Sequence, residues 1–190
     1  MKALLSVVVA SSMLLHAQQM PPPSAPLARF SWSETQAHEL DHSRTIREAP
    51  DLSAAEKTAL TNAVVLQMKR DDDLVEDLTE RQVRVLAEET RVELVDLNGD
   101  GKPEIIAQAN GLGPCGGTGN CIFWIFEQTA NGLKLLLDTN DRSEVTFEKI
   151  LIRPWSTNGF RDIVLGSHSN ATNRNLVWFQ FAHGAYRIHA

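Results

Sequence analysis

The stretch DLNGDGKPE, residues 96–104, lies where the chain changes from helical to strand-like sequence patterns. Side chains with oxygen donors stand at its first, third, fifth and ninth positions, and a glycine, Gly101, stands at its sixth. The donors are Asp96, Asn98, Asp100 and Glu104. Apolar segments flank the stretch at residues 92–95 and 105–107. The arrangement predicts a cation-binding turn between two strands.

Calcium is the cation that this donor set favours. Calcium takes about six to eight oxygen ligands from carboxylates, amides, carbonyls and water. Gly101 permits a sharp turn, and Lys102 can offer its backbone carbonyl. The predicted metal ligands are Asp96, Asn98, Asp100, Lys102 and Glu104. We expect a structural ion with an affinity on the order of 10⁻⁴–10⁻³ M. The alternative is a hairpin turn in which Asp and Asn cap their own backbone without an ion.

The loop differs from an EF-hand, because its twelfth position is Ala107 instead of glutamate and its flanks predict strands. It resembles the calcium loops of FG-GAP and VCBS-type repeats, in which a DxNxDGxx(D/E) run joins two strands. In that family, several repeats build propeller blades, whereas this chain has one such loop. A wider pattern adds the segments 115–124 and 158–164 and resembles a family of uncharacterised exported bacterial proteins. That resemblance covers roughly the C-terminal half and implies no known activity.

The N-terminus predicts export. Lys2 precedes an apolar run, residues 3–15, and Ala17 ends it, so residues 1–17 are typical of a cleavable signal peptide. The run is too short to span a membrane. Residues 18–30 form a proline-rich linker. We therefore expect a secreted or periplasmic protein without membrane insertion after cleavage.

Charge and cysteine content narrow the class of protein further. The formal net charge is −6, and an acidic chain argues against nucleic acid as a partner. The two cysteines, Cys115 and Cys121, enclose a glycine-rich segment and predict one disulfide in an oxidising compartment. Their spacing differs from the CxxC of redox pairs.

Periodicity predicts an α+β fold in which residues 31–190 form one domain. Residues 31–90 are expected to be helical, with helices over 52–70 and 80–89, although a strand is the alternative for 80–89. Capping-box patterns begin at Ser53 and Thr79. Residues 91–190 predict strands of an antiparallel meander forming one twisted sheet. The expected strands are 92–96, 104–109, 122–127, 133–138, 145–153, 162–166 and 176–182, with 186–189 as a further edge.

A second motif, His38-Glu39-Leu40-Asp41-His42, matches HExxH. On a helix this spacing places two imidazoles on one face for zinc, with Glu39 as general base. The flanks lack an apolar face, and no motif supplies a third ligand. The sequence thus favours a non-enzymatic, calcium-stabilised binding or envelope-associated module with an unidentified protein or glycan partner. The alternatives are a secreted zinc metallohydrolase using His38, Glu39 and His42, or an inhibitor-like interaction protein presenting the loop 111–120.

Overall fold

The computed structural model describes residues 37–70, 72–111, 113–117, 119–140, 146–168 and 174–189. The predicted signal peptide and proline-rich linker lie outside these residues, as do residues 31–36 at the start of the predicted helical part. The described chain has a mixed α+β fold.

Within the described residues, three helices precede the strands: α1 (Ala54–Met68), α2 (Asp72–Val75) and α3 (Glu80–Glu88). Both capping boxes are present. The Ser53 hydroxyl accepts from the Glu56 amide at 3.3 Å, while the Glu56 carboxylate accepts from the Ser53 amide at 2.7 Å. Thr79 and Gln82 make the equivalent pair at the start of α3. The strand alternative for residues 80–89 is therefore wrong, because a satisfied cap fixes the first turn of a helix there. Residues 37–53 hold turns and isolated bridges, so the helical part begins later than predicted.

Eight strands follow in the part of the chain that the structure describes, and each predicted strand has a counterpart. They are β1 (Arg91–Val95), β2 (Glu104–Gln108), β3 (Phe123–Thr129), β4 (Gly132–Asp138), β5 (Lys149–Thr157), β6 (Phe160–His168), β7 (Arg174–Ala182) and β8 (Ala185–Ile188). Every neighbouring pair is antiparallel.

The strands form two four-stranded sheets, β1-β2-β3-β4 and β5-β6-β7-β8, where the sequence predicted one. The reason lies in the central strands of the first sheet, which are apolar on both faces. All five residues of β2 are buried. Such a sheet needs a cover on each side, and a single meander would leave one face in water.

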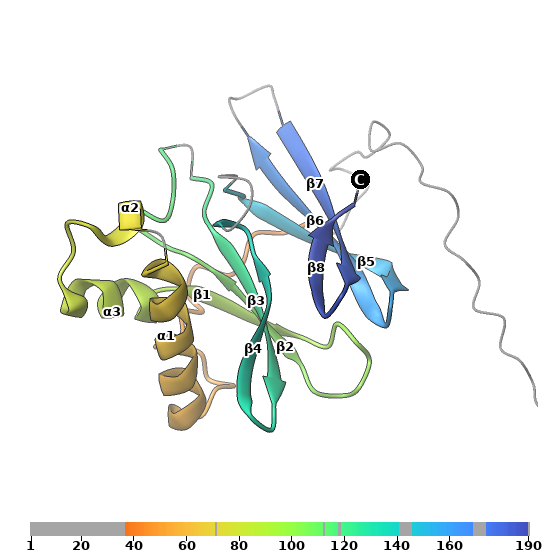
Figure 1. The fold of residues 1–190 in the computed structure, drawn as a ribbon, viewed down its shortest axis with the longest axis horizontal. Helices are drawn as coiled ribbons and strands as arrows, with labels where there is room; N and C mark the ends of the chain where they lie inside the picture. Colours follow the sequence, from red (N-terminus) through yellow and green to blue (C-terminus); the bar gives the residue numbers. More distant parts are fainter. Residues whose placement is uncertain are drawn as a thin grey trace, which may run out of the picture.

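The molecule accordingly has three layers, with helices at the left of Figure 1, β1–β4 in the centre and β5–β8 at the right. On β3, Trp124 and Phe126 pack into the cluster beneath the helices, whereas Phe123 and Ile125 enter the cluster between the sheets. The alternation of side chains along a strand produces this division. The predicted buried face of α1 is confirmed, since Leu60, Val64 and Met68 are at most 1% exposed.

The segment before α1 joins the two sheets along one edge. His38 exchanges two backbone hydrogen bonds of 2.9 Å with Ile150 of β5. A few residues later, the Arg44 carbonyl accepts from the amide of Val92 on β1 at 2.8 Å. Residues 38–46 therefore run from the edge of the second sheet to the edge of the first.

The predicted disulfide between Cys115 and Cys121 is present. Within it, the amide of Gly116 donates to the Asn120 carbonyl at 2.8 Å. Cys121 also exchanges two 2.8 Å backbone hydrogen bonds with Phe147. The bridge thus fixes the loop before β3 and ties it to the segment that leads into β5.

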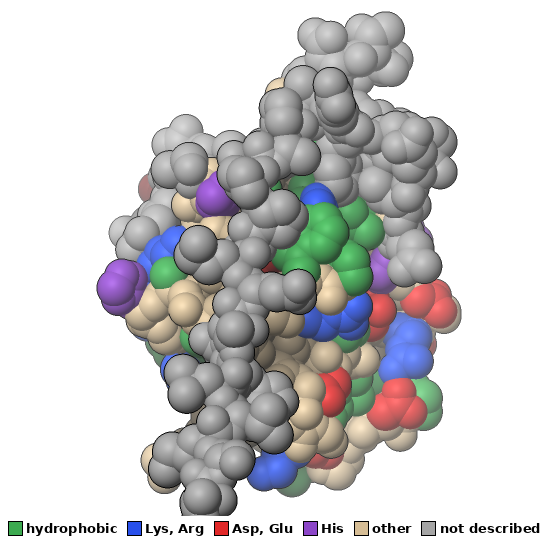
Figure 2. Space-filling view, turned by 90° about the vertical axis from the view of Figure 1, so that its right-hand side faces the viewer, with side chains coloured by type: hydrophobic (Ala, Val, Ile, Leu, Met, Phe, Trp, Pro, Cys, Tyr) green, Lys and Arg blue, Asp and Glu red, His purple; other side chains and the backbone are tan. Residues whose placement is uncertain are grey.

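The outer face of the β5–β8 sheet carries a smaller apolar cluster of Leu151, Val164 and Trp178. Figure 2, which looks from that side of the molecule, shows hydrophobic side chains gathered beside basic ones. Among the described helices, none is long and apolar enough to cross a membrane.

Candidate functional site

The acidic stretch 96–104 connects β1 to β2, as predicted, and Val95 pairs with Glu104 across the base of the hairpin. In Figure 1 this connection extends from the central sheet toward the lower end of the β5–β8 sheet. The loop therefore lies close to the boundary between the two sheets.

Side-chain oxygens hold the loop by accepting hydrogen bonds from its own backbone. The two oxygens of Asp96 accept from the amides of Gly99 and Gly101 at 2.7 and 3.0 Å. Asn98 accepts from the Asp100 amide at 2.9 Å, and Asp100 accepts from the Lys102 amide at 2.7 Å. The bonds of Asn98 and Asp100, each to the amide two residues on, are Asx turns. Gly99 and Gly101 take φ of +75° and +83°, a region that favours glycine.

Glu104 is the buried member of the acidic set, with 2% of its surface exposed. Its carboxylate accepts from the Leu97 amide at 2.8 Å and from the Asn98 side chain at 3.3 Å. Burial raises the pKa of Glu104, and the negative charges of Asp100 and Asp96 raise it further, while the bond from Leu97 opposes them. The Glu104 carboxylate therefore lies close enough to Asp96 and Asp100 to be repelled by both.

Within the described part of the chain, the acidic set has no basic partner. Among the described residues, no lysine, arginine or histidine forms an ion pair with Asp96, Asp100 or Glu104. Most acidic side chains that leave water pair with a base. The loop therefore holds an excess of negative charge at a partly buried position.

The loop also anchors the second sheet. Leu97 is fully buried in the cluster between the sheets, and its carbonyl accepts from the Arg161 amide of β6 at 2.8 Å. The Arg161 carbonyl in turn accepts from the hydroxyl of Tyr186 on β8 at 2.8 Å. Burial raises the pKa of Tyr186, and the charge of Glu104 adds to this effect. A continuous series of hydrogen bonds thus runs from Glu104 through Leu97 and Arg161 to Tyr186.

The donor chemistry of the loop fits a hard cation, because every side chain that would hold it offers oxygen. Within the described part of the chain, no three His, Cys, Asp or Glu side chains already converge on one point. Each carboxylate oxygen that accepts one amide has a further lone pair. Asp96, Asn98, Asp100 and Glu104, with the Lys102 carbonyl, are the residues that would hold calcium.

The HExxH residues do not lie on a helix, because residues 38–42 form an isolated bridge and the start of a turn. The His38 ring contacts Glu93 of β1 at 2.7 Å, and His42 approaches Glu39 at 3.5 Å. The helical spacing that would place both imidazoles on one face is absent. Zinc binding by His38 and His42 stays a prediction, and residues 38–42 do not form the helix that this prediction assumes.

Glu93 is a site residue that the sequence did not reveal, because the two partners are 55 positions apart. Glu93, His38 and Glu39 line a polar depression of about 440 Å³ together with Asp41 and Asp51. The Asp41 carboxylate accepts from the backbone and hydroxyl of Ser43 and is thereby engaged in a turn of its own.

The sequence patterns also did not reveal a buried carboxylate on β6. Asp162 is fully buried, and one of its oxygens accepts from Trp178 and Gln180 on β7, both at 3.0 Å. Nearby on β5, the Arg153 guanidinium lies 3.8 Å from the centre of the Trp155 ring. These contacts orient the aromatic side chains of the outer face, and they depend on strand pairing that the sequence pattern does not specify.

No protein-family model matches the chain, and neither the curated proteins nor the solved structures include a significant match.

Proposed function

We propose that this protein is an exported, non-enzymatic binding module whose fold is stabilised by calcium at the loop 96–104. The observation that carries the proposal is the uncompensated acidic set of that loop. The Glu104 carboxylate is repelled by Asp96 and Asp100, next to a residue, Leu97, that packs in the cluster between the two sheets. A bound calcium ion would supply positive charge at this point.

The structural role of the loop explains why an ion there would matter for stability. Removing the repulsion would strengthen the loop as the element that carries Leu97 between the sheets and accepts the Arg161 amide. An ion that binds only the folded protein stabilises it by mass action. With a dissociation constant on the order of 10⁻⁴–10⁻³ M, about 10 mM calcium would add about 1.4–2.7 kcal/mol.

The exported location rests on two features. The first residues carry the signal-peptide pattern. The disulfide between Cys115 and Cys121 is the kind of bond that persists in oxidising compartments such as the periplasm or the extracellular space.

Thermal unfolding in calcium, in magnesium and in chelator tests the proposal. We expect calcium to raise the melting temperature in a saturable way. Magnesium should do less, because it demands a smaller octahedral site and gives up its water reluctantly. Equal melting temperatures in calcium and in chelator would refute calcium stabilisation.

A further inference from the structure

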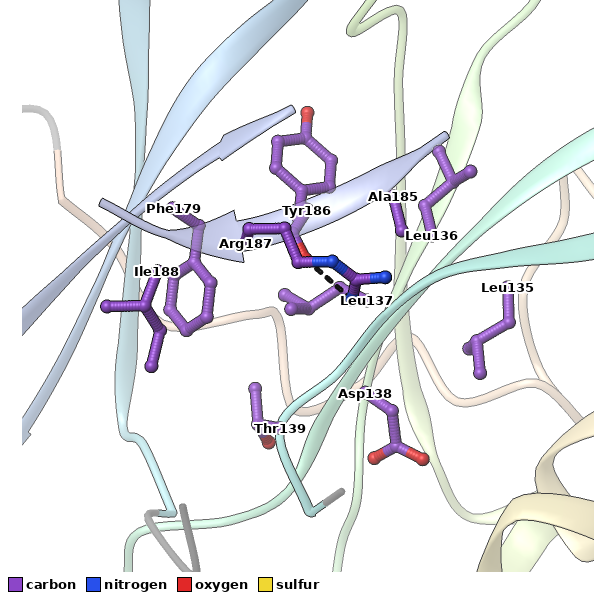
Figure 3. Close-up of a pocket in the computed structure, with 10 residues that line it drawn as sticks. All are labelled: Leu135, Leu136, Leu137, Asp138, Thr139, Phe179, Ala185, Tyr186, Arg187 and Ile188. Atoms are coloured by element: carbon purple, nitrogen blue, oxygen red, sulfur yellow. Dashed lines mark hydrogen bonds between the residues drawn. The ribbon is translucent and has the colours of Figure 1, made fainter. Parts of the chain in front are cut away.

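A cleft lies between the end strands of the two sheets, on the side of the molecule away from the segment 38–46. β4 ends the first sheet and β8 ends the second, and the two strands contact each other without pairing. Figure 3 shows β8 beside β4, with Arg187 and Leu137 between the two strands and Tyr186 pointing away from β4. The cleft has a volume of about 380 Å³. This is the lower end of the range for small-molecule sites, about 300–1,000 Å³.

The wall of the cleft is about half apolar and half polar in its exposed surface. Leu137 and Phe179 are each 4% exposed and form its inner surface, while Ile188 is 49% exposed and stands at the rim. A hydrocarbon group that entered the cleft would cover this surface and gain the free energy of apolar burial. The wall therefore suits the apolar part of a small ligand.

One cation, Arg187, faces the apolar side chains of the wall. Arg187 of β8 extends across the cleft toward β4 (Figure 3). Its guanidinium makes one long hydrogen bond, 3.5 Å, to the Tyr186 carbonyl. Among the described residues, no carboxylate forms an ion pair with Arg187. Asp138, which also lines the cleft, accepts from the Asn140 amide at 2.9 Å.

We propose that the cleft binds a small amphipathic monocarboxylate, with its hydrocarbon part against Leu137 and Phe179 and its carboxylate on Arg187. The planar guanidinium offers paired N–H groups that match the two oxygens of a carboxylate. Among the described lining residues Arg187 is the one lysine or arginine, and the Asp138 carboxylate lines the same cleft. A phosphate with two negative charges would therefore meet more repulsion there than a monocarboxylate.

This inference rests on the proposed binding function, because it names a class of ligand for the module. Ligand binding in the cleft does not require calcium. The series of hydrogen bonds from Glu104 reaches Tyr186, which lines the cleft. Ligand binding is therefore measured both in calcium and in chelator. Binding that persists in both conditions would support the cleft even if the calcium proposal failed.

Titration of the full chain with octanoate, followed by NMR or calorimetry, tests the inference. Acetate supplies the charge without the hydrocarbon, and octanol supplies the hydrocarbon without the charge. We expect saturable octanoate binding with shifts in β4 and β8, at least about tenfold weaker binding of octanol, and none of acetate.

Arg187→Met removes the charge and keeps an apolar side chain, and Arg81→Met on α3 is the matched control. Arg81 is exposed and forms no ion pair with the described residues. We expect Arg187→Met to bind octanoate and octanol equally and Arg81→Met to behave as the wild type. No saturable octanoate binding by the wild type, or an unchanged preference for octanoate in Arg187→Met, would overturn the proposal.

Discussion

Replacing Leu97 by alanine should destabilise the protein far more than its place in an acidic loop would suggest. Leu97 is fully buried among residues of both sheets. Truncation removes its branched side chain from that cluster and leaves a cavity, which costs about 2–5 kcal/mol in protein cores. A substitution in an ordinary surface loop changes stability by about 0.5 kcal/mol or less. A loop packed between the sheets and an ordinary surface loop therefore predict losses of stability that differ severalfold.

Equilibrium unfolding in urea, followed by tryptophan fluorescence, measures this effect. The matched control is Leu66→Ala on α1, which makes the same chemical change at a side chain that is 55% exposed. We expect Leu66→Ala to stay within about 0.5 kcal/mol of the wild type. A cost below about 1 kcal/mol for Leu97→Ala would contradict the placement of the loop between the sheets.

Three further variants test other parts of the structure. Ser53→Ala should cost about 1 kcal/mol through loss of the helix cap. Hydrogen bonds from Ser53 lower the pKa of Glu56. The stability that the ionised Glu56 contributes is therefore present above the usual glutamate pKa and is lost as pH falls through the lowered pKa. A cost of Ser53→Ala that is unchanged in acid would argue against this contribution. Tyr186→Phe removes the hydroxyl that donates to the Arg161 carbonyl, and it should lower the free energy of unfolding in urea by about 1 kcal/mol. An unchanged free energy of unfolding would exclude a net contribution from that hydrogen bond. Replacing Cys115 and Cys121 by serine should lower the free energy of unfolding by about 2 kcal/mol relative to the oxidised wild type, and equal stability would contradict the chain-entropy estimate.

Local patterns were sufficient to predict α1, α3 and the strands, but they did not predict the turns of residues 37–53 or the short helix α2. The Ser53 and Thr79 caps involve residues three positions apart, so the sequence contains the whole interaction. The turn at 96–104 was predictable for the same reason, since most of its hydrogen bonds join residues within the loop.

Interactions between distant residues were not predictable from these patterns. The division into two sheets depends on which strand faces which, and a meander of eight strands has the same local sequence in either arrangement. The burial of Glu104 arises because β6 and β8 pack over the loop through Arg161 and Tyr186. The HExxH spacing predicts a zinc site only on a helix, and pairing of His38 with β5 holds that segment in an extended conformation instead.

The most direct test of the central claim is the stability of Asp100→Asn relative to the wild type, measured in chelator and again in about 10 mM calcium. Asparagine keeps an oxygen for the Lys102 amide but removes a charge that faces Glu104. In chelator the variant should equal or exceed the wild type, because the repulsion is relieved. In calcium the wild type should be the more stable protein, by up to about 1.4–2.7 kcal/mol. If the free energies of unfolding of the two proteins differ by the same amount in chelator and in calcium, calcium does not stabilise the fold through this loop.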